Sequence, residues 1–116
     1  MTGKNIIDVA RRMINDLRVD DSKKRYPLAV MTAYLNDGLQ DLYGRRPMHL
    51  LDTDGSLKTF TELNTTTVLS TVLDIDETYR EPMAHYLAYR TFAEDSGDDN
   101  NAQLAQQQYA LYLQST

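Results

Sequence analysis

Residues 73–114 read LDIDETYREPMAHYLAYRTFAEDSGDDNNAQLAQQQYALYLQ, and this stretch decides the fold. It predicts two helices joined by one acidic turn. The first helix, over residues 82–94, is apolar on most of its circumference. Its apolar side chains are Met83, Tyr86, Leu87, Tyr89, Phe92 and Ala93. A helix with so little polar face must be surrounded by protein, so the stretch indicates either a tight helical core or an assembly in which neighbouring subunits supply the cover.

Proline and glycine mark the ends of these two helices. Pro82 suits the first turn of the first helix, where its missing N–H costs nothing. Gly97 suits a left-handed helix end, and the aspartates that follow it can accept the first unpaired N–H groups of the next helix. The second helix is therefore predicted over residues 100–113. Its apolar stripe is predicted to contain Ala102, Ala105, Tyr109 and Leu113.

Two further helices are predicted upstream. Over residues 5–16, apolar residues recur at three- and four-residue spacing and form one stripe. Over residues 27–44, Pro27 opens and Gly44 closes a second such pattern. Gly38 lies inside this helix, where a glycine costs about 0.5–1 kcal/mol relative to alanine. Its presence predicts that another element approaches closely at that point.

Between residues 48 and 75 the pattern changes. Residues 57–63 (LKTFTEL) and 68–75 (VLSTVLDI) are rich in β-branched or apolar side chains, and four polar residues separate them. This pattern favours a short β-hairpin, which needs cover because an isolated hairpin is marginal in water. The predicted fold is therefore mainly α. It is one domain over residues 1–116, a four-helix bundle-like unit with a short β-hairpin or long loop inserted between its second and third helices.

Composition excludes several classes of protein. The 116 residues include no cysteine, which excludes disulfides and thiolate metal sites. No apolar run approaches the ~18 residues of a membrane span, so no membrane partner is predicted. Asp8 lies inside the apolar part of the N-terminal stretch, which argues against a signal peptide. The net charge of −5 is unevenly placed, because residues 1–58 carry 10 Lys/Arg and 8 Asp/Glu whereas residues 59–116 carry 2 and 9.

No residue pattern indicates an active site, so no catalytic residue, cofactor or metal ligand is predicted, and the protein is expected not to be an enzyme. His85 lies on an apolar helix, where a hydrogen-bonded structural histidine is expected rather than a base. His49 lies in the connector after the second helix. Residues 52–55 (DTDG) resemble the start of a calcium loop, but their glycine is fourth rather than sixth. A simple turn explains them better.

Nucleic-acid binding has weak support from three basic runs. These lie at residues 11–12 (RR), 23–25 (KKR) and 45–46 (RR). A sequence pI near 4.8 argues against a phosphate-binding face. We expect these residues to be the solvated ends of helices, and a minor DNA-binding role is kept as an alternative.

Tyrosines gather near the end of the chain. Tyrosine buries a large ring and keeps a polar tip, so it is common in cores with wet edges and at interfaces. Tyr109 fits the core stripe of the last helix, whereas Leu111 and Tyr112 leave that stripe. An interface and the core are therefore both open for Leu111 and Tyr112. The candidate partner-binding residues are Tyr109, Leu111, Tyr112 and Leu113.

Three blocks of sequence together resemble the head–tail adaptor proteins of tailed bacteriophages, also called connector or head-completion proteins. The first is VARRMIND at residues 9–16, and the second is YLNDG at residues 34–38 followed by RP at residues 46–47. The third is YLAYR at residues 86–90, followed by ED at residues 94–95 and the alanine- and glutamine-rich last helix. The order and spacing of the blocks agree across about two-thirds of the chain.

The resemblance implies a small helical bundle that assembles as a twelve-fold ring beneath the portal of the DNA-filled capsid. The ring would lengthen the channel for double-stranded DNA, without sequence-specific binding, and would dock a tail or stopper protein. The implied partners are thus the portal protein, the tail or stopper protein and further copies of this chain. The implied location is the virion, after synthesis in the host cytoplasm. In some members the C-terminal segment grips the portal, which corresponds here to residues 109–116.

The chain departs from the family pattern in one respect, and two other functions fit the sequence. Its inserted region, residues 48–70, is shorter than in many look-alikes. One alternative function is a small phage regulatory or interaction protein that is never part of the particle. The other is the minor DNA-binding role. Presence in purified particles would separate the adaptor from both alternatives.

Overall fold

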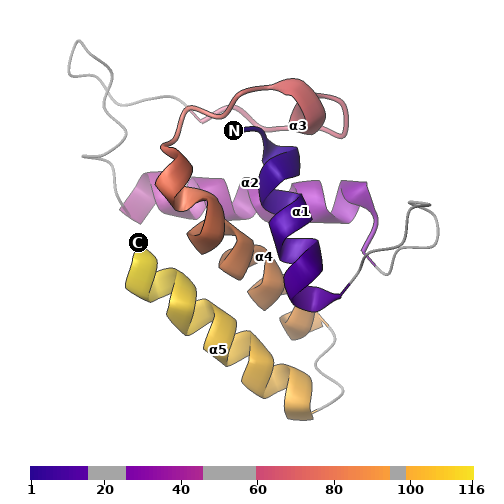
Figure 1. Cartoon of the computed structure of the whole chain (residues 1–116), viewed down its shortest axis with the longest axis vertical. Helices are drawn as coiled ribbons and strands as arrows, with labels where there is room; N and C mark the ends of the chain where they lie inside the picture. The colour runs from indigo at the N-terminus through magenta and orange to yellow at the C-terminus, as the bar shows by residue number, and fades with distance from the viewer. Residues whose placement is uncertain (16–25, 46–59, 95–98) are drawn as a thin grey trace.

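A single helix, α4 (Arg80–Glu94), lies at the centre of the fold, where the other three long helices pack against it (Figure 1). The structure, a computed structural model, describes residues 1–15, 26–45, 60–94 and 99–116. In chain order the elements are α1 (Gly3–Ile14), α2 (Leu28–Arg45), α3 (Thr67–Ser70), the 3-10 turn η3 (Glu77–Tyr79), α4 and α5 (Asp99–Ser115). The prediction of a mainly helical chain is confirmed, and each long helix begins and ends within two residues of its predicted bounds.

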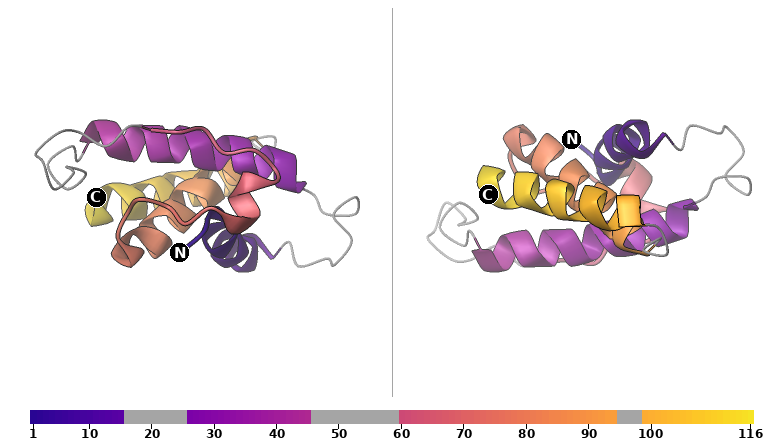
Figure 2. Two further views of the ribbon diagram at one scale, coloured as in Figure 1. Left: turned by 90° about the horizontal axis from the view of Figure 1, so that it is seen from above. Right: turned by 90° about the horizontal axis from the view of Figure 1, so that it is seen from below.

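Most of the circumference of α4 is covered, as its composition predicts. Figure 2 shows α2 along one side of the molecule and α1 along the opposite side, with α5 between them. The cover comes from within the chain, so α4 needs no neighbouring subunit to hide it. Its buried residues are Pro82, Met83, Ala84, Tyr86, Leu87, Ala88 and Thr91.

The start of α4 lies two residues before Pro82. The turn η3 leads into it, and the Asp76 side chain accepts a hydrogen bond from the Thr78 N–H at 2.9 Å. Pro82 occupies the third position of α4, within the first turn, where N–H groups have no partner inside the helix. The prediction that regular helix begins at Pro82 is corrected accordingly, because the proline marks the first turn rather than the first residue.

The close approach predicted at Gly38 is confirmed. A Cβ atom at this position would lie 2.6 Å from Tyr86 Cδ1 and 2.8 Å from Met83 Cε, both on α4. These separations are well below van der Waals contact. Glycine therefore lets α2 pack directly onto side chains of the central helix, which offsets its cost in helix propensity.

The predicted β-hairpin is wrong for the part of the insertion that the structure describes. Residues 60–75 contain no strand, and the start of the expected second strand forms helix α3 instead. Asn64 explains this difference, because its side-chain oxygen accepts from Thr66 N at 2.9 Å and from Thr67 N at 2.8 Å. Such local bonds start a helical turn in competition with a strand. Residues 48–59 of the predicted insertion lie outside the described residues.

A side chain takes the place of a neighbouring strand beside residues 60–63. The buried Asn36 of α2 donates from Nδ2 to Leu63 O at 2.8 Å and accepts at Oδ1 from Leu63 N at 2.8 Å. Both backbone groups of Leu63 are thereby paired without a sheet. Further along, an isolated antiparallel bridge joins Thr2 to Val72. The segment is therefore tied to α2 at one end and to the N-terminus at the other.

Candidate interaction surfaces

Four tyrosines form the seam between α4 and α5. Tyr86 and Tyr89 belong to α4, and Tyr109 and Tyr112 belong to α5. Ring centroids lie 5.2 Å apart for Tyr86 and Tyr112, and 4.7 Å apart for Tyr89 and Tyr109. Both distances fall in the range of favourable ring contacts, so this tyrosine seam stabilises the pairing of the two helices.

The hydroxyl of Tyr112 links the tyrosine seam to α2. Tyr112 is fully buried, and its hydroxyl donates to Asp41 Oδ2 at 2.5 Å. The same carboxylate oxygen accepts from Arg45 Nε at 2.7 Å. Burial, and then the bond to Asp41, raise the pKa of Tyr112 far above its usual value near 10. The hydroxyl is therefore a fixed donor at neutral pH rather than a titrating group.

The four residues predicted to bind a partner differ in how exposed they are. Tyr112 lies in the core, and Tyr109 is half-buried in the tyrosine seam, where its hydroxyl accepts from Arg45 at 3.3 Å. Leu111 and Leu113 are 40% and 39% exposed. Residues 109–115 are thus the last turns of a packed helix. Of the four predicted residues, the two leucines are the ones that a partner can reach.

The inner stripe of α5 differs from the predicted one. Ala105, Tyr112 and Thr116 are buried, whereas Ala102 and Leu113 are exposed. Both sets satisfy the helical period, so the spacing of apolar residues could not choose between them. On the inner side Tyr112 gains ring contacts and a carboxylate on α2 for its hydroxyl. The predicted core position of Leu113 is therefore wrong.

The outer face of α5 carries no charged side chain. No Asp, Glu, Lys, Arg or His occurs in residues 100–116, although charged residues make up 25% of the chain. Because α5 packs chiefly on α4, its opposite side is open. Exposed helix faces normally carry charge, so this surface is unusual for a helix that meets only water. The residues of the outer face are Ala102, Gln103, Gln106, Gln107, Ala110, Leu111, Leu113 and Gln114.

Leu111 and Leu113 lie on opposite flanks of this outer face. Two residues correspond to about 200° around an α-helix with 3.6 residues per turn. A single flat surface cannot cover both side chains. Burial of both leucines requires a partner that encloses the end of α5 from two sides, or two partners.

Charged side chains on α2 and α4 are paired with one another. Arg90 Nη1 donates to Asp37 Oδ2 at 2.8 Å and to the Tyr86 hydroxyl at 3.1 Å. The Arg90 guanidinium also lies 4.7 Å from the ring centre of Tyr34. Burial raises the pKa of Tyr34 and of Tyr86 above the usual value. The exposed side of α2 and α4 therefore resembles an internally satisfied surface more than a binding site.

The arginines of the basic runs differ in exposure. Arg11 is only 5% exposed, and its Nη1 donates to the Tyr26 carbonyl at 2.8 Å. The expectation of a solvated helix end is therefore wrong for Arg11. It is confirmed for Arg12 and Arg45, which are exposed near the ends of α1 and α2. Residues 23–25 and 46 lie outside the described residues.

His85 is hydrogen-bonded, as expected for a structural histidine. Its Nδ1 lies 2.6 Å from Gln108 Oε1, and this bond joins α4 to α5. Residues 49 and 52–55 lie outside the described part of the chain. Among the described residues, no group of three or more His, Cys, Asp or Glu side chains is arranged to hold a metal ion. Across the same residues, no helix combines the length and the apolar character needed to cross a lipid bilayer.

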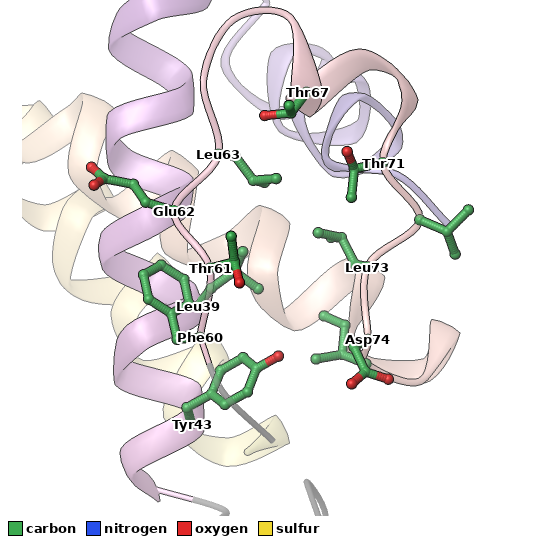
Figure 3. A pocket seen from close by; sticks show the side chains of 12 residues that line it. Leu39, Tyr43, Phe60, Thr61, Glu62, Leu63, Thr67, Thr71, Leu73 and Asp74 are labelled. Atoms are coloured by element: carbon green, nitrogen blue, oxygen red, sulfur yellow. The ribbon is translucent and has the colours of Figure 1, made fainter. Parts of the chain in front are cut away.

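A cavity of about 310 Å³ lies beside the inserted segment (Figure 3). Residues 60–63 form one wall, residues 71–75 form the other, and α2 closes a third side. Leu63 and Leu73 face each other across it, and the Thr61 hydroxyl lies on the same wall as Leu63. The volume is at the lower end of the range for ligand pockets, which suits one or two side chains better than a large cofactor.

The surface around this cavity is also poor in charge. Residues 63–73 contain no charged side chain. Leu69 is 45% exposed, and Val72, which lines the cavity, is 72% exposed. Among the described residues that line it, Glu62 and Asp74 are acidic and none is basic. We call the cavity together with Leu69 and Val72 the 60–75 face.

Comparison with known proteins gives no relative: no protein-family model, no curated protein and no solved structure matches this chain.

Proposed function

We propose that the protein is a structural component of a tailed-phage virion, a head–tail adaptor that forms a ring beneath the portal. It extends the DNA channel and docks the tail or a stopper protein. The order of the three sequence blocks that resemble the adaptor family supports this proposal. The charge-free outer face of α5 carries it, because an exposed helix face without charge suits contact with a partner.

The outer face of α5 suits a contact because its burial requires no desolvation of a charged side chain. Burying a charged side chain in a contact is costly, and interface cores are accordingly depleted in charged residues. Residues 100–116 place glutamine, alanine and leucine where a solvated helix would carry lysine or glutamate. A partner can cover such a surface with little loss of hydration. The mixture of glutamine with leucine suits a contact that forms after the subunit has folded in water.

The charge balance fits a conduit for DNA better than a DNA-binding protein. Tight binding to duplex DNA rests on lysine and arginine contacts to phosphates. The net charge here is −5, and residues 59–116 carry 9 acidic and 2 basic side chains. An acidic ring would let the polyanion pass without retaining it. The proposal therefore includes double-stranded DNA as cargo of the lumen and no sequence-specific contact.

Mass spectrometry of purified particles of the encoding phage tests the proposed location. We expect peptides of this protein in the particle, at an abundance relative to the portal protein that matches one ring per portal. A non-structural protein of the same phage serves as the control for carry-over. Absence from the particle would refute the adaptor role and leave the regulatory protein as the better account.

A double variant tests the role of the outer face of α5. Because Leu111 and Leu113 are exposed, replacing both with aspartate should lower the melting temperature by only about 4–8 °C, as two surface changes of about 0.5 kcal/mol each would. Incorporation into particles should fall sharply. The matched control is Gln40→Asp, which places the same charge at an exposed position of α2. Equal incorporation of both variants would show that the outer face makes no contact.

A further inference from the structure

The cavity of the 60–75 face has an apolar part and a polar part. Leu63 and Leu73 face each other across it, and Leu39 of α2 adds to its apolar lining (Figure 3). Figure 3 also shows the hydroxyl of Tyr43, another lining residue, turned toward the side that carries Asp74. An occupant of the cavity therefore needs an apolar part and a polar group that can meet a hydroxyl and a carboxylate.

The charge beside the cavity has one sign. Residues 60–76 contain three acidic side chains, Glu62, Asp74 and Asp76, and no basic side chain. All three acidic residues are exposed, and Glu62 and Asp74 line the cavity. The resulting negative potential attracts a cationic group and repels phosphates and carboxylates. Nucleic acid and a second copy of this chain, whose net charge is −5, are therefore poor occupants.

A lysine or arginine side chain meets both requirements of the cavity. These side chains pack their methylene stems along apolar surface and keep the charged head at a polar edge. A volume of about 310 Å³ suits one such side chain rather than a large ligand. Asp74 already interacts within the chain, but a carboxylate offers about four acceptor positions, so a bound cation adds to its contacts.

The surface next to the cavity suits an apolar neighbour of that basic residue. Val72 lines the cavity and is 72% exposed, and Leu69 on α3 is 45% exposed. Both lie within residues 63–73, which carry no charge. A segment that presents a basic and an apolar side chain together can therefore use the cavity and the apolar surface in one contact.

We propose that the 60–75 face docks a basic segment of another protein. One lysine or arginine of that segment enters the cavity, with its stem between Leu63 and Leu73. Its charged head lies by the Tyr43 hydroxyl and the Asp74 carboxylate, and an apolar neighbour packs on Val72.

The inference rests on the proposed function for the source of this segment. In the proposed adaptor the outer face of α5 meets the portal. Figure 1 shows α3 and α5 along opposite edges of the molecule. The 60–75 face is thereby turned away from the portal, and the segment belongs to the tail or stopper protein.

A peptide titration followed by NMR tests the chemistry of the site on the free protein. Three short capped peptides alternate leucine with lysine, with glutamine or with glutamate. The lysine peptide should shift the backbone amide signals of residues 60–75, and the glutamate peptide should not. Its affinity should exceed that of the glutamine peptide by roughly threefold to fivefold, as expected for an exposed ion pair. The difference should disappear in about 1 M NaCl.

Two substitutions with the same change in net charge form the matched comparison. Asp74→Asn should weaken binding of the lysine peptide by roughly threefold, because it removes the charge by the cavity. Glu94→Gln, at an exposed position of α4 outside the 60–75 face, should leave the affinity unchanged. Thr61→Trp, which fills the cavity from its wall, should abolish the shifts. Equal affinities of the Asn and Gln variants, or shifts spread over all acidic surfaces, would overturn the proposal.

Particles separate this inference from the proposed function. Phage assembled with Thr61→Trp should retain this protein beneath the portal and lack tails, whereas phage with Glu94→Gln should be complete. Normal tails on the Thr61→Trp particles would overturn the docking site and leave the adaptor role standing. Specific binding of the lysine peptide at the cavity, with the protein absent from particles, would refute the adaptor role and keep the site for a basic segment.

Discussion

The α4–α5 pair and the 60–75 segment hold their shapes by different means. The pair is held along its length by the tyrosine seam and by repeated side-chain contacts at helical spacing. The segment is held at a few points, chiefly where Asn36 binds both backbone groups of Leu63 and where Asn64 starts α3. Periodic packing is therefore spread over many residues, whereas the segment depends on single polar side chains.

This difference teaches where a single change should matter most. A periodic seam loses one contact among many when one side chain is altered. A segment fixed at a few points loses one of its main attachments. The following changes test that contrast, from the largest expected effect to the smallest.

Asn36→Ala should have the largest effect on stability. The change leaves the N–H and C=O of Leu63 without their partner in a buried setting, and each unsatisfied buried group costs about 1–3 kcal/mol. We expect a loss of about 2–4 kcal/mol in the free energy of unfolding, measured by urea denaturation. Gln40→Ala, at an exposed position of the same helix, is the control and should change little. A loss below about 1 kcal/mol for Asn36→Ala would show that water replaces the amide.

Gly38→Ala and Gly44→Ala should act in opposite directions. A Cβ at Gly38 would lie 2.6 Å from Tyr86 Cδ1, whereas a Cβ at Gly44 meets nothing within 4 Å. We expect Gly38→Ala to destabilise by about 1–3 kcal/mol through overpacking against a ring that cannot move aside. Gly44→Ala should stabilise by up to about 1 kcal/mol through helix propensity. Thermal unfolding of both variants measures the two changes in stability. Stabilisation by Gly38→Ala would contradict the tight α2–α4 contact.

Tyr112→Phe should have a smaller effect because Asp41 keeps its bond to Arg45. Loss of one hydrogen bond to a partly exposed carboxylate is expected to cost about 1 kcal/mol. Tyr109→Phe is the control, since the bond from Arg45 to its hydroxyl is longer, at 3.3 Å, and exposed. An equal loss of stability for both variants would show that the Tyr112–Asp41 hydrogen bond contributes no more than the exposed Arg45–Tyr109 bond.

The same tyrosines predict the response to alkaline pH. Burial raises the pKa of Tyr34, Tyr86 and Tyr112 in the folded state above the usual value near 10. Above pH 10 the unfolded chain releases these protons and the folded chain retains them, so stability that is present below pH 10 is lost as the pH rises further. Denaturation between pH 8 and 11 should show this loss, and its slope should be shallower in Tyr112→Phe. An unchanged slope would indicate that Tyr112 ionises freely in the folded protein.

The sequence predicted the long helices because each carries a stripe at helical spacing and a clear signal at one or both ends. Gly38 could be interpreted in advance because a glycine inside a helix has a cost that a close contact explains. The insertion was misjudged because threonine and valine favour strands only where a neighbouring strand exists. Here the partner of Leu63 is Asn36, which lies 27 residues away in sequence and gives no local signal.

The candidate surface was predicted in part. The last helix was expected to meet a partner, and the absence of charge over residues 100–116 was available in the sequence. The sequence placed Leu113 rather than Tyr112 on the buried stripe of α5 because two stripes fit the helical period equally well. The choice depended on Asp41, which the fold brings to Tyr112 from 71 residues away. The cavity could not be predicted, since its walls come from segments that were expected to pair as strands.

Sedimentation velocity of the protein mixed with the portal protein of the proposed phage particle tests the central claim most directly. The account predicts a fast boundary that contains both proteins in a constant ratio. Gln40→Asp should form the same complex. The variant with aspartate at Leu111 and Leu113 should stay in the slow boundary while remaining folded at the temperature of the experiment. Absence of a complex with the unaltered protein, or full entry of the aspartate variant into it, would contradict the account.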